Sequence, residues 1–257
     1  MEGSFEKPRE LTDKLDIIIT NGCPAHFHSK LELLVVRKGA VQATVNGVSS
    51  RLVEGQAAIA DSCAVHIWTP EPGAEGVVLI IPTQYQTEYA AVMKGRTFAD
   101  PILRDETIGR GILTMLELLQ IDRPESLVTR GLLNAILGTF IENLPLKERE
   151  TADQLMRDVL LYISDNFTEP LTLAGLSKKY GYTPSHFSRI FSAYTGDHIP
   201  DYLGALRAER AAALLRSGQP VTEAAADAGF QSMRTFYRIF MQTYNRTPKE
   251  YLKTVYG

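Results

Sequence analysis

The sequence has few cysteines, a single tryptophan and no long hydrophobic run. Its 257 residues contain two cysteines, Cys23 and Cys63, which are too few for a disulfide framework. The longest apolar runs, such as residues 77–81, are far shorter than the roughly 20 residues of a membrane-spanning helix. No charged segment followed by an apolar one begins the chain, so no secretion signal is predicted. These absences predict a cytoplasmic protein with no membrane partner.

A large net charge is also lacking, because the formal sum is −3. This sum argues against a uniformly basic nucleic-acid binder, but it conceals a difference between the two halves. Residues 1–150 carry 15 basic and 20 acidic residues, whereas residues 151–257 carry 12 basic and 10 acidic ones. A hydrophobic content of 44% and the length together predict two globular domains. A polyanion would bind the second one.

The first half reads as short strands followed by helices. Apolar, β-branched runs separated by turn residues predict strands at 15–20, 31–37, 41–45, 57–60 and 77–81. Asn46-Gly47 suits a tight hairpin, since both central positions need positive φ. Apolar residues at three-to-four spacing between 112 and 140 predict two amphipathic helices. We therefore expect a β-barrel over residues 1–90 and a helical segment for dimerisation or signal transfer over residues 91–150.

Three of the five histidines lie in the predicted barrel. His26 and His28 share one strand face, Glu32 follows four residues later, and His66 comes after a further strand. This spacing resembles the two cupin motifs, in which these positions converge inside a small barrel. The resemblance implies a divalent transition-metal site formed by His26, His28, Glu32 and His66. Asp61 and Cys63 depart from the proline and glycine that are usual in the second motif.

Two readings of this cluster remain open. The same residues, with Trp68, would also line a pocket for a small polar effector without any metal. The sequence favours the effector pocket over the metal, so that no cofactor is certain. Cys23 and Cys63 each precede a site histidine by three residues, which allows a thiolate role, but buried inert thiols are favoured.

The second half contains an internal repeat. An offset of 49 residues superimposes Arg189-Ile190-Phe191 on Arg238-Ile239-Phe240. Each copy predicts a short helix, a glycine turn and a second helix, over about residues 171–194 and 220–243. The predicted caps and turn residues are Thr172, Gly181 and Thr183 in the first copy and Thr222, Gly229 and Ser232 in the second. A long helix over 200–217 joins the copies.

Two helix-turn-helix units joined by a helix resemble the DNA-binding domain of the AraC/XylS family of transcriptional regulators. The resemblance covers residues 153–255, within a predicted domain of 151–257. It implies base contacts from the second helix of each unit, and Lys178 and Lys179 are expected to contact phosphates. The positions that face away from the apolar stripes of these helices are Ser185, His186, Ser188 and Arg189 in the first unit and Met233, Arg234, Thr235 and Arg238 in the second. Asn245 replaces the usual glycine.

The predicted fold is thus multidomain, with an N-terminal cupin-like β-barrel, flanking helices and a C-terminal all-α domain. The predicted function is an effector-responsive transcription regulator, an activator rather than an enzyme. The implied partners are double-stranded promoter DNA, a small-molecule effector, RNA polymerase and a second copy of the chain. The alternative is a metal-dependent cupin enzyme with an accessory helical domain, which leaves the repeat without a purpose.

Overall fold

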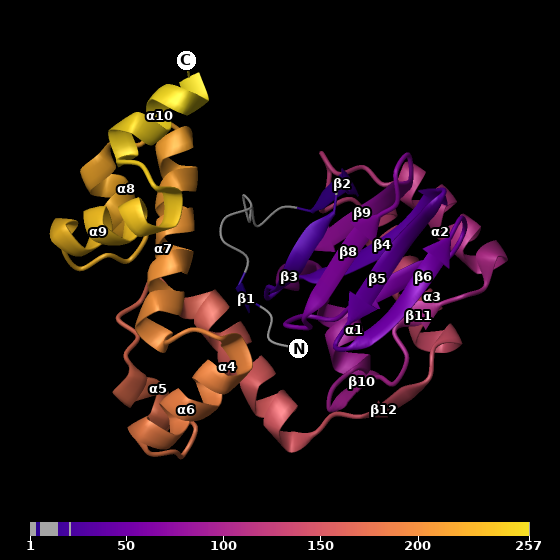
Figure 1. Cartoon of the computed structure of the whole chain (residues 1–257), viewed down its shortest axis with the longest axis horizontal. Coiled ribbons are helices and arrows are strands. Elements are labelled where there is room, and N and C mark those ends of the chain that lie inside the picture. Colours follow the sequence, from indigo (N-terminus) through magenta and orange to yellow (C-terminus); the bar gives the residue numbers. More distant parts are fainter. Residues whose placement is uncertain (1–3, 6–14, 21, 257) are drawn as a thin grey trace. The chain divides into compact units, whose positions relative to one another are not determined.

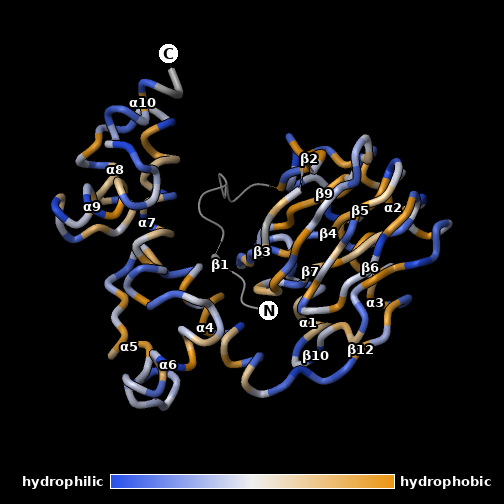
Figure 2. Tube along the Cα trace, in the orientation of Figure 1, coloured by the Kyte–Doolittle hydropathy of each residue, from blue (hydrophilic) through white to orange (hydrophobic). Residues whose placement is uncertain are grey.

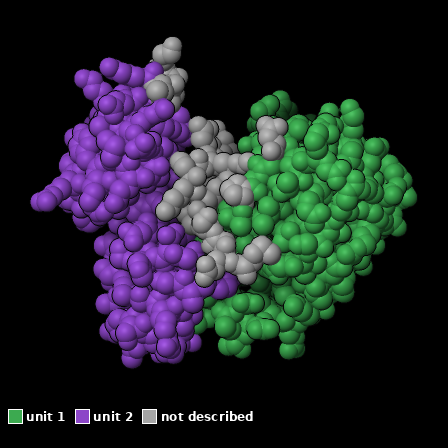
Figure 3. All heavy atoms as spheres, in the orientation of Figure 1, with its two compact units in different colours: residues 1–3, 13–157 green, residues 4–12, 158–257 purple. Residues whose placement is uncertain are grey.

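The computed structural model describes residues 4–5, 15–20 and 22–256. Apart from the first twelve residues, the chain forms two compact units, Asp13–Arg157 and Asp158–Gly257 (Figure 3). The first unit is rich in strands and the second is helical (Figure 1). Among the described residues, no helix is both long and apolar enough to cross a membrane.

The strands occupy the first unit and are mostly short. Their bounds are β1 (Ser4–Phe5), β2 (Asp16–Thr20), β3 (Cys23–Phe27), β4 (Leu31–Lys38), β5 (Ala40–Val45), β6 (Val48–Val53), β7 (Ala57–Ala60), β8 (His66–Pro70), β9 (Glu75–Ile81), β10 (Arg96–Phe98), β11 (Ile102–Leu103) and β12 (Leu146–Glu148). The five predicted strands are all present. The predicted hairpin is confirmed as well, since Asn46 and Gly47 both have positive φ and Val45 pairs with Val48.

Two antiparallel sheets form the core of this unit. One contains β3, β8, β5 and β6 as neighbours in that order, and the other has the order β11-β7-β4-β9-β2. Hydrophobic residues run along β4 and β9 (Figure 2), and β4 is buried on both faces. Leu34 and Val36 face a core shared by the two sheets, whereas Leu33 and Val35 join a second core with the helices. Glu32 has the parity of Leu34, so the strand period places its carboxylate between the sheets.

Helices cover the outer face of the second sheet. The helical elements of the first unit are η1 (Thr83–Tyr85), α1 (Thr87–Val92), α2 (Glu106–Glu117) and α3 (Leu127–Asn143). Ile112 of α2 and Phe140 of α3 are fully buried in the same core as Leu33. Burial of each such side chain contributes about 1.5–3 kcal/mol. The predicted helical segment 91–150 therefore contains two long helices, but also the short strands β10, β11 and β12.

The second unit consists of helices. Its elements are α4 (Thr151–Asn166), which begins in the first unit, α5 (Leu173–Lys179), α6 (Pro184–Thr195), α7 (Ile199–Arg216), α8 (Val221–Asp227), α9 (Met233–Tyr244) and α10 (Pro248–Tyr256). Alanines 208, 211 and 212 of α7 pack against Phe236 and Phe240 of α9. The predicted linking helix over 200–217 corresponds to α7. The predicted fold class, a β-rich N-terminal part followed by a helical domain, is confirmed.

Candidate functional site

The pair α5–α6 forms the first helix-turn-helix unit. Thr172 caps α5, because its hydroxyl accepts a hydrogen bond from the Gly175 amide at 3.0 Å. Gly181 ends the first helix with φ of 77°, a backbone conformation that favours glycine. Thr183 caps α6 by accepting from the His186 amide, and Pro184 occupies its first turn. The two predicted caps and the predicted turn glycine are therefore confirmed.

The pair α8–α9 repeats this arrangement with one difference. Gly229 turns the chain with φ of 89°, and Ser232 caps α9 by accepting from the Thr235 amide at 3.3 Å. The predicted cap at Thr222 is wrong, because α8 begins at Val221 and Pro220 is its N-cap residue. The fixed φ of proline suits a helix start, and the helix begins two residues earlier than a cap at Thr222 predicts. Asn245, which replaces the usual glycine, takes the left-handed conformation with φ of 52°, which asparagine tolerates.

The predicted DNA-contacting residues occupy the outward faces of α6 and α9. The exposed ones are Ser185, His186, Arg189, Arg234, Thr235 and Arg238, together with Lys178 and Lys179 on α5. Ser188 and Met233 are half-buried, and Met233 packs against the apolar core of its unit. The Lys179 ammonium lies 4.1 Å from the centre of the Tyr162 ring. Tyr237 lies between Arg234 and Arg238 on this outward face and is 47% exposed. The sequence analysis did not include it, because the neighbouring aromatic residues suggest that it belongs to the core.

A second polar constellation lies between the two sheets of the first unit. His26 on β3 and His66 on β8 are direct strand partners, Glu32 projects from β4, and His28 follows the end of β3. The prediction that His28 belongs to the strand is therefore wrong by one residue, although its ring still joins the cluster. The ring centres of His26 and His66 lie 4.2 Å apart, and that of His28 lies 5.1 Å from His66. All four side chains are at most 2% exposed.

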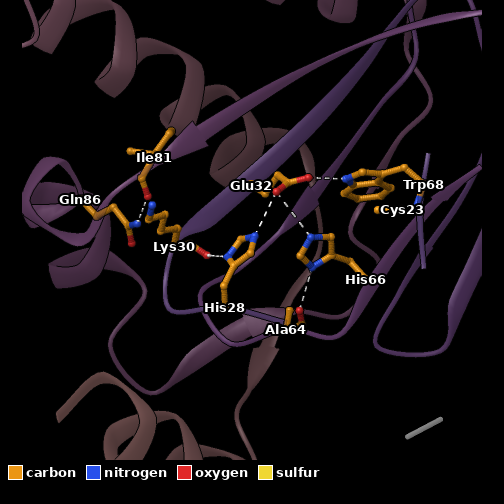
Figure 4. Close-up of polar contacts among 9 residues, drawn as sticks. All are labelled: Cys23, His28, Lys30, Glu32, Ala64, His66, Trp68, Ile81 and Gln86. Atoms are coloured by element: carbon orange, nitrogen blue, oxygen red, sulfur yellow. Dashed lines mark hydrogen bonds and ion pairs between the residues drawn. The ribbon is translucent and has the colours of Figure 1, made fainter. Parts of the chain in front are cut away.

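Glu32 stands at the centre of this constellation (Figure 4). Its Oε2 atom lies 3.0 Å from Nε2 of His28 and 3.6 Å from Nε2 of His66. Its Oε1 atom accepts a hydrogen bond from the Trp68 indole at 2.5 Å. Burial raises the pKa of the Glu32 carboxyl, but the imidazoles of His66 and His28 outweigh this effect and hold the pKa well below its usual range. The predicted residues His26, His28, Glu32, His66 and Trp68 thus come together.

Comparison with known proteins decides the family. A helix-turn-helix domain family matches residues 176–254. The chain is 31% identical over 99 residues to the regulatory protein SoxS of Escherichia coli, which covers 38% of this chain and 92% of SoxS. It is 32% identical over 101 residues to the right origin-binding protein of the same organism, which covers 39% of this chain and 35% of that protein. The chain belongs to the AraC/XylS family of transcriptional regulators. It is therefore a DNA-binding regulator of transcription.

The likeness of this AraC/XylS regulator to solved structures extends beyond the DNA-binding unit. Wild-type ToxT from Vibrio cholerae, solved with bound unsaturated fatty acid, matches with a TM-score of 0.52 at 14% sequence identity. The match covers 93% of this chain and 91% of ToxT. At this identity the match establishes a shared fold, with a β-rich part followed by helices.

The loop between β7 and β8 connects the buried cluster of this regulator to the start of α4. Residues 61–65 precede His66, and the amide of Cys63 donates to the His28 carbonyl at 2.8 Å. At the other end of the loop, Asp61 accepts a hydrogen bond from Arg149 at 2.5 Å and lies 3.8 Å from Arg157 of α4. These side chains are 5%, 9% and 15% exposed, respectively. One short loop therefore contacts both the histidines and the helix that leads into the second unit.

The two cysteines lie beside the cluster without joining it. Both side chains are buried, and neither forms a disulfide within the described part of the chain. Cys23 Sγ accepts from the Trp68 amide at 3.3 Å. Cys63 takes φ of 67°, which shows why the cupin motif usually has glycine here. Among the described residues, the group that could hold a metal ion consists of His26, His28, Glu32 and His66.

Proposed function

We propose that this regulator reads promoter DNA with α6 and α9 and that its β-rich unit binds an effector that controls this reading. The observation that carries the proposal is the repeated, capped helix pair, which presents an arginine at equivalent positions, Arg189 and Arg238. An exposed arginine can donate two hydrogen bonds to O6 and N7 of guanine. Ser185, His186, Ser188, Met233, Arg234 and Thr235 complete the proposed reading faces, and Lys178 and Lys179 contact phosphates.

The proposed effector site is the cluster of His26, His28, Glu32, His66 and Trp68. These side chains are at most 2% exposed, and donor atoms of His26, His28, Glu32 and His66 lie within 4.8 Å of one another, so the cluster gathers polar groups that a polar effector could bind. ToxT, a chain of the same fold, was solved with a bound unsaturated fatty acid, which supports the binding of a small molecule by this chain. An effector that prefers the DNA-competent arrangement by a few kcal/mol suffices to shift its population.

In this proposal the protein acts in the cytoplasm as a homodimeric activator rather than an enzyme. The helices α2 and α3 mediate dimerisation or pass the signal, and RNA polymerase is the partner at the promoter. A metal-dependent enzyme is the second candidate, because the four-residue cluster has the donors that such an enzyme uses. That alternative gives no role to the repeated helix pairs.

The test is an electrophoretic mobility shift with the DNA upstream of the protein's own operon or its neighbours. We expect specific binding that weakens roughly 5- to 150-fold in Arg189→Ala and in Arg238→Ala, since a bidentate contact contributes about 1–3 kcal/mol. Arg51→Ala is the matched control, because Arg51 is an exposed arginine of the first unit that pairs with Glu71. Equal binding by all three variants would contradict the proposed reading faces. Absence of any shift, together with turnover of a candidate substrate, would favour the enzyme.

A further inference from the structure

The exposed apolar side chains of the second unit gather on one helix. Among the described residues of this unit, the large hydrophobic side chains that remain exposed are Tyr237 and Met241, and both belong to α9. Apolar side chains exposed singly are ordinary on a protein surface, whereas two on the same face of a helix form a surface that a partner can cover. The question is therefore which partner covers this part of α9.

Tyr237 and Met241 continue a stripe that begins at Arg234. Residues three or four positions apart lie on the same side of a helix, so positions 234, 237 and 241 follow one another along α9. Phe236 and Phe240 point into the core and are fully buried, so the stripe lies outside this core. The ring centres of Tyr237 and Phe236 lie 5.3 Å apart, with an angle of 58° between the rings. The Tyr237 ring thus rests on a fixed core residue while half of its surface stays exposed.

The charges around the stripe favour DNA as the partner. Arg234 and Arg238 are both exposed, and the twelve residues of α9 include no aspartate or glutamate. The guanidinium of Arg238 donates a hydrogen bond to the Gln242 side chain at 3.0 Å, which orients it along the helix. An apolar surface flanked by cations matches the grooves of DNA, where base edges lie between rows of phosphates. The stripe is therefore an apolar flank of the proposed reading face of α9.

The reading helix of the first unit lacks this flank. The offset of 49 residues superimposes Tyr237 on Ser188 and Met241 on Ser192. Both serines are half-buried, and Oγ of Ser192 lies 3.0 Å from Nδ1 of His198. The two reading helices thus share an exposed arginine at equivalent positions but differ in the apolar surface beside it. This difference predicts that they select different bases.

We propose that Tyr237 is a specificity-determining residue of this regulator, whose ring contacts the C5-methyl group of a thymine in the major groove, with Met241 extending the apolar surface by one turn. The inference rests on the proposed function, since it concerns a helix proposed to read DNA. The thymine methyl group is the apolar feature by which the major-groove edges of the base pairs differ, so an apolar side chain selects it. Because Ser188 offers no comparable surface, this selection is confined to the base pairs read by α9.

Deoxyuridine in place of thymine tests the proposal at the level of one methyl group. The base pairs read by α9 are located first, as those whose substitution no longer weakens binding in Arg238→Ala. Each thymine of the bound promoter fragment is then replaced in turn, and mobility shifts with the full chain give the affinities. We expect a loss of about 4-fold at a thymine read by α9, the effect of burying one such group, and none elsewhere. Unchanged affinity at every thymine read by α9 would overturn the proposal.

Variants of Tyr237 assign the effect to its ring. Tyr237→Ser introduces the residue of the first unit and should bind the thymine and deoxyuridine fragments equally, whereas Tyr237→Phe should retain the preference of about 4-fold. Val92→Ser is the control, because Val92 is an exposed apolar residue of the first unit. Circular dichroism verifies that each variant is folded. Equal binding of both fragments by Tyr237→Phe would mean that the hydroxyl rather than the ring acts, and would overturn the proposal.

The outcomes separate this inference from the proposed function. Specific DNA binding with the same preference for thymine in Tyr237→Ser as in the unaltered chain would overturn the role of Tyr237 and leave the DNA-binding regulator intact. Absence of specific DNA binding by the unaltered chain would contradict the proposed function and this inference together.

Discussion

At the scale of single residues, the two turn glycines of the helix-turn-helix units offer a comparison within one molecule. Gly181 and Gly229 both have φ between 70° and 90°. A Cβ added at Gly181 meets nothing within 4 Å, whereas one at Gly229 would lie 2.4 Å from the Thr168 carbonyl oxygen and 2.7 Å from its Cα. Alanine at position 181 therefore adds only the free-energy cost of a left-handed backbone conformation. Alanine at position 229 adds, besides this cost, a collision with backbone atoms of Thr168 that cannot rotate away.

We therefore expect Gly181→Ala and Gly229→Ala to differ strongly. Gly181→Ala should destabilise the helical unit by about 1–2 kcal/mol, the usual cost of a left-handed alanine. Gly229→Ala should cost clearly more and should weaken DNA binding through displacement of α9. Thermal unfolding of the full chain, followed by circular dichroism at 222 nm, checks both. Equal melting temperatures for the two variants would contradict the packing against Thr168.

At the scale of elements, helix caps make an equally local prediction. Ser232→Ala removes the hydroxyl that accepts from the Thr235 amide and should cost about 1 kcal/mol, within a range of about 0.5–2. Thr222→Ala should be neutral or slightly stabilising, because Thr222 lies exposed inside α8 and alanine favours helices. The melting temperature of each variant is the measurement. A larger decrease in melting temperature for Thr222→Ala than for Ser232→Ala would indicate that Thr222 caps α8 after all.

Elements with strong local signals could be predicted from the sequence, and those that depend on distant partners could not. The Asn46-Gly47 hairpin and the glycine turns follow from backbone conformations that few residues tolerate. The strand β8 carries polar residues and a proline, and β12 carries two charged residues, so their pairing rather than their composition makes them strands. The resemblance to the cupin motifs implied that the histidines of the first unit converge. The contacts of His28 and His66 with the carbonyls of Lys30 and Ala64 depend on loop conformations that no spacing reveals.

At the scale of the whole molecule, the function requires that the buried cluster and the DNA-binding unit influence each other. The loop at residues 61–65 is the physical connection available within the first unit, because Asp61 holds Arg149 and Arg157 while the same loop leads into His66. A contact across 88 residues of sequence, between Asp61 and Arg149, gives no signal in the composition or periodicity of the chain. Coupling between sites needs such a contiguous element with two arrangements.

Arg157→Gln tests whether α4 carries this coupling. Arg157 lies 3.8 Å from Asp61, which retains Arg149 in the variant, so the chain should stay folded and its affinity for the effector should change little. The ratio of DNA affinities with and without a small molecule that stabilises the protein in a thermal-shift screen should move toward one, because the loop no longer engages α4 directly. Arg104→Gln is the control, since it removes an exposed ion pair with Asp100 in the same unit. If Arg157→Gln preserves the full effect of this small molecule on DNA affinity, the signal does not pass through this contact.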